Sequence, residues 1–179
     1  IRLHLSCGFV LREPLPQESD EVTLLRNRHR QWFLTNRQLD DAQGRSWLAT
    51  RSVNDALLVL THPERSGAVF GTVGWVDLAQ PGECEGGRII FEPARGEGLA
   101  PRRVITGLAR EMVTASAAYL ASERAMHVIW CRIRNGNGLA EQLAADCGFR
   151  RMGTGEALPD GWADSNSSIW KLECRPNPE

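Results

Sequence analysis

The chain has 179 residues, 42% of them hydrophobic and 24% charged, which is the composition of an ordinary globular protein with a sizeable core. Its net charge of −1 gives no clustered basic excess, so no nucleic-acid partner is expected. No apolar run of about 18 residues is present, so no membrane partner is expected either. The sequence therefore predicts one domain over residues 1–179.

The N-terminal part is predicted to contain strands and two helices. Residues 8–11 form a short apolar strand, and Ser19 and Asp20 are suitable N-cap residues for a helix over residues 21–34. A second helix is predicted over residues 39–49. Two apolar strands, 56–60 and 68–78, are separated by turn residues, which is typical of a β-hairpin.

The rest of the chain is built around a long predicted helix. A strand that includes residues 89–91 stops at Pro93, and a helix follows over residues 101–122, with apolar side chains three and four positions apart. A β-branched strand over 126–133, a short helix over 138–145 and a last strand over 167–174 complete the chain. Strands on both sides of a strand–helix–strand unit indicate a mixed α+β fold.

Five cysteines are scattered along the chain, and none belongs to a Cys-x-x-Cys pair. This argues against a zinc site and a disulfide framework, and favours a reducing compartment such as the cytoplasm. The four histidines are equally dispersed, so the sequence predicts no metal site.

A glycine-bearing loop, residues 95–100, joins the strand that ends at Pro93 to the long helix. Glycines let the backbone approach a ligand, and the start of a helix favours an anion. A phosphate-binding P-loop is excluded because the Gly-Lys-Ser/Thr sequence is missing. A dinucleotide-binding loop lacks its third glycine, because Pro101 occupies that position.

Four segments carry a resemblance to a known family: Leu11-Arg12 with Arg26-Asn27 and Trp32-Phe33; Glu85-Gly86-Gly87-Arg88 with Pro93; Arg95-x-x-Gly98-x-Ala100; and Asn137-Gly-Leu-Ala140 with Gly148-Phe149. In this order they resemble the GNAT superfamily of acyl-CoA-dependent N-acyltransferases. The nearest branch contains the ribosomal-protein alanine acetyltransferases and the nucleotide-amino-sugar acetyltransferases.

The resemblance implies a mostly antiparallel sheet of six to seven strands, splayed between strands four and five and flanked by about four helices. It also implies acetyl-CoA as the cofactor. The pyrophosphate of coenzyme A would lie on the loop amides, and its pantetheine arm would lie along the edge of strand four. The implied cofactor-binding residues are Ile90, Phe91, Glu92, Arg95, Gly96, Glu97, Gly98, Leu99, Ala100, Arg103, Asn137 and Ala140.

The reaction needs a base that takes a proton from the attacking amine. The resemblance places a family glutamate at Glu85, although a solvated turn residue is an equally good interpretation of this position. Glu83 and Glu92 are weaker candidates. Many family members carry a tyrosine seven residues after the asparagine, where this chain has Ala144, so the acid that protonates the leaving thiolate is unassigned.

Arg26, Asn27, Trp32 and Trp75 are candidates for the acceptor pocket, with core packing as the alternative for both tryptophans. The predicted function is acetyl transfer to a primary amine of a small molecule, such as an amino sugar or an antibiotic intermediate. Three alternatives stay open: acetylation of protein N-termini, a non-catalytic acyl-CoA-binding module, and a nucleotide-binding oxidoreductase that rests on Gly-x-Gly alone. A homodimer also stays open.

Overall fold

The computed structural model describes residues 1–52, 54–162 and 166–174. Its strands are β1 (Arg2–His4), β2 (Val10–Arg12), β3 (Asp55–Thr61), β4 (Gly71–Asp77), β5 (Glu83–Phe91), β6 (Val128–Arg134), β7 (Arg150–Arg151) and β8 (Ser167–Glu173). Its α-helices are α1 (Ser19–Arg28), α2 (Asp41–Ala49), α3 (Arg102–Glu123) and α4 (Gly138–Asp146). Together they confirm the expected mixed α+β class.

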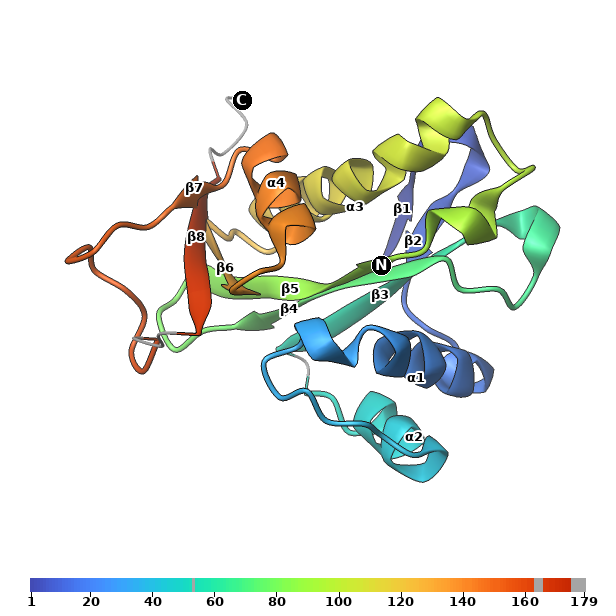
Figure 1. The fold of residues 1–179 in the computed structure, drawn as a ribbon, viewed down its shortest axis with the longest axis horizontal. Helices are drawn as coiled ribbons and strands as arrows, with labels where there is room; N and C mark the ends of the chain where they lie inside the picture. Colours follow the sequence, from blue (N-terminus) through green and yellow to red (C-terminus); the bar gives the residue numbers. More distant parts are fainter. Residues whose placement is uncertain (53, 163–165, 175–179) are drawn as a thin grey trace.

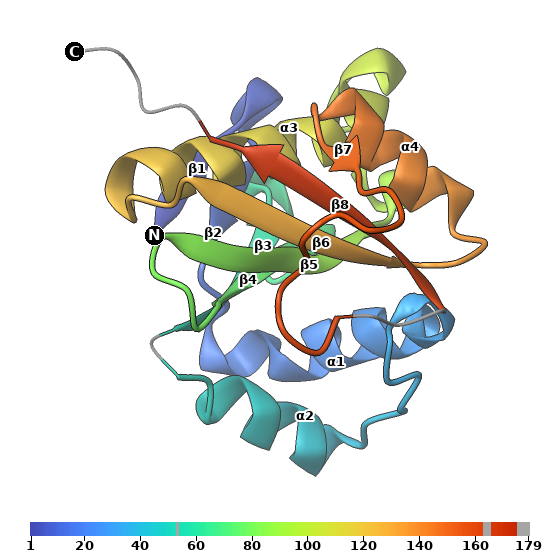
Figure 2. The ribbon, with the colours of Figure 1, turned by 90° about the vertical axis from the view of Figure 1, so that its left-hand side faces the viewer.

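All the described strands belong to one eight-stranded sheet, in the order β1-β2-β3-β4-β5-β6-β8-β7. Helices α1 and α2 cover one face of the sheet, and α3 and α4 cover the other (Figures 1 and 2). Leu108 and Met112 of α3 are fully buried against the sheet, as the spacing of the apolar side chains predicts. None of the described helices is long and apolar enough to cross a membrane.

Strands β5 and β6 are parallel neighbours that separate along their length. Their ladder has three pairs, from Glu83↔Val128 to Glu85↔Trp130. Beyond Glu85, within the described residues, β5 pairs only with β4, and β6 pairs only with β8. The resulting gap in the ladder, between β5 after Glu85 and β6 after Trp130, is called here the β5–β6 opening. It confirms the expected splay, because β5 and β6 are the fourth and fifth strands of the sequence prediction.

The strand count is higher than expected because of two short strands. Strand β1 has three residues and β7 has two, Arg150 and Arg151. Neither contains enough alternating apolar positions to produce a strand signal. Their pairing with β2 and β8 comes from tertiary contacts that a local pattern does not show.

The first helix ends earlier than predicted, at Arg28 instead of residue 34. A single turn of 3₁₀ helix (Arg30–Trp32) follows. The side chain of Asn27 donates to the carbonyl of Leu39 at 2.7 Å and accepts from the N–H of Leu39 at 3.0 Å. These two bonds fold residues 33–39 back along α1, so the chain leaves the helix axis.

Candidate functional site

The loop after β5 provides a small backbone cradle. One turn of 3₁₀ helix (Pro93–Gly96) is followed by Gly98, whose φ of 84° lies in the left-handed region that favours glycine. Gly96 is buried, and a Cβ atom there would lie 2.9 Å from Cδ1 of Ile105. Glycine is therefore favoured for a different physical reason at each position: the backbone conformation at Gly98 and close packing at Gly96.

Four N–H groups around this loop are available to a ligand. Those of Gly98, Ala100, Arg102 and Arg103 donate to no acceptor within the described residues. Pro101, the N-cap of α3, has no N–H to add. Because the positive end of the 22-residue helix α3 lies at the same place, the cradle suits a diphosphate such as that of coenzyme A.

The Arg95 side chain anchors the loop to the α1 face of the sheet. Its Nε lies 2.7 Å from the carboxylate of Glu92, and its Nη1 donates to the carbonyl of Val69 at 2.5 Å and to Glu21. Glu92 also contacts Nε2 of His29 at 3.1 Å. Arg95 and Glu92, both expected to bind the cofactor, therefore have side chains that fix the position of the loop on α1 and on the segment just before β4.

The C-terminal ends of β5 and β6 bring the loop and Asn137 to the same edge of the sheet, because the two strands are parallel. Asn137 is the N-cap of α4, and its Oδ1 accepts from the N–H of Ala140 at 3.3 Å. Its side-chain NH₂ has no partner within the described residues. Asn137 and the cradle thus lie beyond the open ends of the two strands that border the β5–β6 opening.

The backbone edge of β5, and not the side chains of Ile90 and Phe91, borders the β5–β6 opening. The side chain of Ile90 is 5% exposed and packs with Val22 and Leu25 of α1, while Phe91 packs on the opposite side against the core with α3. A one-residue bulge at Arg88, which has a φ of 54°, interrupts the pairing of β5 with β4.

Carboxylates and aromatic rings gather on the sheet face opposite α3, beside the last pairs of the β5–β6 ladder. Nε1 of Trp130 donates to Glu83 at 2.6 Å. Nε and Nη2 of Arg132 donate to the two carboxylate oxygens of Glu85 at 2.9 and 3.0 Å. The Arg132 guanidinium also lies 4.4 Å from the ring centroid of Trp162. We call Glu83, Glu85, Trp130, Arg132 and Trp162 the acidic–aromatic cluster.

The four residues predicted for an acceptor pocket do not come together. Trp75 is 1% exposed and packs 5.9 Å from Tyr119 in the core, which corrects the expectation that it lines a pocket. Arg26 and Asn27 bind the backbone of residues 37 and 39, so their side chains hold the chain after α1 in place. Trp32 alone is well exposed, at 42%.

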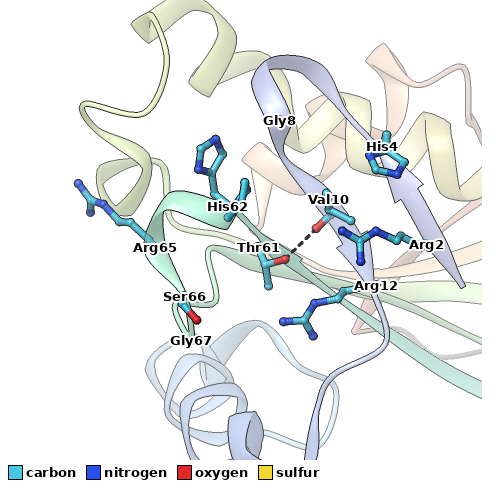
Figure 3. Close-up of a pocket in the computed structure, with 11 residues that line it drawn as sticks. Arg2, His4, Gly8, Val10, Arg12, Thr61, His62, Arg65, Ser66 and Gly67 are labelled. Carbon is cyan, nitrogen blue, oxygen red and sulfur yellow. Dashed lines mark hydrogen bonds between the residues drawn. The ribbon is translucent and has the colours of Figure 1, made fainter.

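A cavity of about 350 Å³ lies elsewhere, between β1, β2 and the β3–β4 hairpin (Figure 3). Two of its basic lining residues bind within the protein: Arg12 donates to Glu18 at 2.8 Å, and Nε2 of His62 lies 3.0 Å from the carbonyl of Cys7. Arg65 reaches the carbonyls of residues 95 and 97 in the glycine-bearing loop after β5, residues 95–100, which is called the cofactor loop from here on because the sequence predicts cofactor binding there. The sequence contains no signal for this last contact, because an arginine in a hairpin turn is normally solvated.

The comparison with protein families decides the identity. The model of the acetyltransferase (GNAT) domain matches residues 9–150. The chain belongs to the GNAT acetyltransferase family. This confirms the resemblance found in the sequence, and the chain is accordingly an N-acetyltransferase. No curated protein sequence matches it significantly.

Solved GNAT structures share the fold at low sequence identity. RimL, a ribosomal L7/L12 α-N-protein acetyltransferase in complex with coenzyme A, is 11% identical with a TM-score of 0.72, over 97% of this chain and 98% of RimL. YncA from Salmonella typhimurium with acetyl-CoA is 16% identical with a TM-score of 0.65, over 96% and 98% of the chains. The spermidine/spermine N-acetyltransferase SpeG from Vibrio cholerae is 16% identical with a TM-score of 0.66, over 93% and 94%.

Proposed function

We propose that this GNAT protein transfers the acetyl group of acetyl-CoA to a primary amine of a small molecule. One observation carries the proposal: the β5–β6 opening has at its edge the Asn137 side chain and the four N–H groups, from the loop after β5 and the start of α3, that are unpaired within the described residues. The coenzyme A and acetyl-CoA named with RimL and YncA support the same cofactor here.

The cofactor-binding residues have distinct tasks in this proposal. The N–H groups of Gly98, Ala100, Arg102 and Arg103 bind the pyrophosphate, and the unpaired edge of β5 after Glu85 binds the amides of the pantetheine arm. The NH₂ of Asn137 donates a hydrogen bond at the other side of the opening. Bound acetyl-CoA supplies an activated thioester carbonyl to an amine held next to it.

The acidic–aromatic cluster is the proposed acceptor side. Carboxylates next to indole rings attract an ammonium group by charge and by cation–π contact. Glu85 is the proposed base, directly or through a water molecule, because a carboxylate has about four acceptor positions and Arg132 occupies two of them. Deprotonation gives the neutral amine that attacks the thioester carbonyl; the C–N bond forms, the C–S bond breaks, and coenzyme A leaves as the thiolate, which is then protonated to the thiol.

A contact across the α1 side of the opening favours a small acceptor over a protein N-terminus. Nη1 of Arg134, at the end of β6, donates to the carbonyl of Gln31 at 2.9 Å and to that of Phe33 at 3.4 Å. These bonds tie the 3₁₀ turn after α1 to β6, and so restrict the space in which a polypeptide would have to lie.

Release of the coenzyme A thiol in the presence of an amine panel tests this function. The panel contains amino sugars, polyamines and short peptides with free N-termini. We expect release with a small amine and none with the peptides. Release with peptides alone would establish the protein N-terminus as the acceptor, and acetyl-CoA binding without release for any amine would favour the non-catalytic module.

A further inference from the structure

Arg65, from the β3–β4 hairpin, holds the cofactor loop by two backbone carbonyls. Its Nη1 donates to the carbonyl of Arg95 at 3.0 Å, and its Nη2 donates to that of Glu97 at 2.9 Å. Arg65 lines the 350 Å³ cavity, but Figure 3 shows its side chain directed away from Arg2 and Arg12. The guanidinium thus links the hairpin to a loop about thirty residues away in sequence.

Because the peptide bond is planar, a hydrogen bond that fixes a carbonyl also fixes the direction of the N–H of the next residue. In a trans peptide the carbonyl of one residue and the N–H of the next point in opposite directions. Because Arg65 fixes the carbonyl of Glu97, it also directs the N–H of Gly98 to the opposite side, where that N–H has no partner among the described residues. The carbonyl of Arg95 and the N–H of Gly96 are related in the same way.

The hairpin is itself well fixed. Arg65 lies in one turn of 3₁₀ helix (Pro63–Arg65), where its N–H donates to the carbonyl of His62 at 3.1 Å. His62 is 6% exposed, and its Nε2 lies 3.0 Å from the carbonyl of Cys7. A planar guanidinium on such a support can hold two carbonyls at once, which the single ammonium of a lysine cannot do in the same geometry.

We propose that Arg65 is a positioning residue for the diphosphate of the acyl-CoA, acting through the peptide planes of the cofactor loop. This inference rests on the proposed function. Without Arg65, the peptide between Glu97 and Gly98 is free to rotate, because glycine accepts both orientations at little cost. The rotated peptide presents a carbonyl oxygen to the phosphate, which repels it.

The test compares the variants Arg65→Gln, Arg65→Lys and Arg2→Gln with the wild-type protein by calorimetry. Arg2→Gln removes the same charge from the same cavity, and so serves as the matched control. Each protein is titrated with coenzyme A and with S-acetylpantetheine, which lacks the diphosphate. Thermal melting checks the fold, and the amide resonance of Gly98 in the ligand-free protein reports the state of the loop.

We expect Arg65→Gln to raise the Kd of coenzyme A about tenfold, the value for two lost hydrogen bonds, and Arg65→Lys to raise it less. Arg2→Gln should keep the wild-type Kd, and the Kd of S-acetylpantetheine should be the same in all four proteins. The Gly98 amide resonance should broaden or double only in the Arg65 variants.

Wild-type affinity for coenzyme A in folded Arg65→Gln, or an equal loss for both ligands, would overturn the positioning role. If Arg65→Gln does not fold, Arg65→Lys decides by the same criteria. Wild-type protein that binds neither ligand would overturn the proposed function itself, and the role of Arg65 with it. If only the positioning role of Arg65 is wrong, the wild-type protein still binds coenzyme A. Failure of this role and failure of the proposed function therefore give different results.

Discussion

Glu85 and Arg132 form a two-point ion pair at the place where β5 and β6 separate, with N···O distances of 2.9 and 3.0 Å. Each side chain is 25% exposed, so the pair is accessible from the sheet face opposite α3. Planar bidentate pairs of this kind fix the carboxylate in one orientation. Arg132 therefore holds the proposed base in place next to the β5–β6 opening.

Replacing Glu85 by glutamine tests its role as the base. The glutamine side chain has nearly the same shape but cannot take the amine proton, so kcat should fall about 100-fold or more while the Kd of acetyl-CoA stays unchanged. The measurement is the pH profile of kcat, whose acidic limb should disappear.

The matched control is Glu83→Gln, two residues earlier on the same face of β5, where the carboxylate accepts from Trp130. Because Glu83 belongs to the proposed acceptor side, we expect this variant to raise the KM for the amine but to keep kcat within about threefold, the effect of one altered hydrogen bond. An unchanged rate and pH profile in Glu85→Gln would show that Glu85 is not the base, and a large loss in Glu83→Gln would move the assignment to Glu83.

The substitution Gly98→Ala tests the cradle without creating a steric clash. A Cβ atom there would meet nothing within 4 Å, so Gly98→Ala acts only through the φ of 84°, which costs an alanine about 1–2 kcal/mol. We expect the Kd of acetyl-CoA to rise several-fold, and this strain to lower the melting temperature by a few degrees at most. Gly107→Ala, in the exposed part of α3 where a Cβ also meets nothing within 4 Å, should leave the Kd unchanged and stabilise the helix. The same Kd of acetyl-CoA in Gly98→Ala and Gly107→Ala would show that the diphosphate does not bind at Gly98.

The ion pair between Glu18 and Arg12 makes the stability of the fold depend on pH. Burial alone would raise the pKa of Glu18, but hydrogen bonds from Arg12 and the Leu15 N–H outweigh it and hold the pKa below its ordinary value of 4.5. The folded state is thus stabilised above the pKa of the unfolded chain, and this stabilisation is lost as the pH falls through the lower folded pKa. Glu18→Gln should cost about 2 kcal/mol at pH 7.

The difference in unfolding free energy between wild type and Glu18→Gln, from urea titrations, should shrink steadily below pH 4.5. A difference that stays constant down to pH 2 would show that the contribution of Glu18 does not depend on its charge.

The buried thiols should be chemically inert. Burial raises the pKa of Cys84 and of Cys131 to about 12 each, so both are protonated at neutral pH and lack the reactive thiolate. Cys7 is exposed. Iodoacetamide at pH 7.5 should therefore label Cys7 first in the native protein and leave the acetyl-transfer rate unchanged, as followed by peptide mass spectrometry. Rapid labelling of Cys131 together with loss of activity would contradict this.

The sequence predicted those parts of the molecule whose signal is local. The apolar repeat of α3 and the run from Gly96 to Ala100 depend on neighbouring residues, and both the helix and the splayed fold were confirmed. The cofactor-binding and catalytic assignments, including Glu85 and Asn137, stay predictions until ligand binding is measured.

Roles that depend on distant contacts were not predictable. Trp75 was a candidate for the acceptor pocket with core packing as the alternative, and it is a core residue, because its side of β4 faces Tyr119 on α3. Arg26 and Asn27 bind a segment about ten residues later, and Arg65 binds the cofactor loop. An isolated polar residue in a sequence carries no information on which backbone groups it will meet after folding.

Calorimetric titration of the wild-type protein with acetyl-CoA tests directly whether this chain binds the cofactor at the start of α3. The cradle at the start of α3 predicts saturable binding to one site, with a Kd on the order of 10 μM, as is usual for substrates of enzymes. The same titration on Gly98→Ala should give weaker binding. No heat of binding and no displacement of a fluorescent acyl-CoA at tens of micromolar acetyl-CoA would show that the cradle is not an acyl-CoA site.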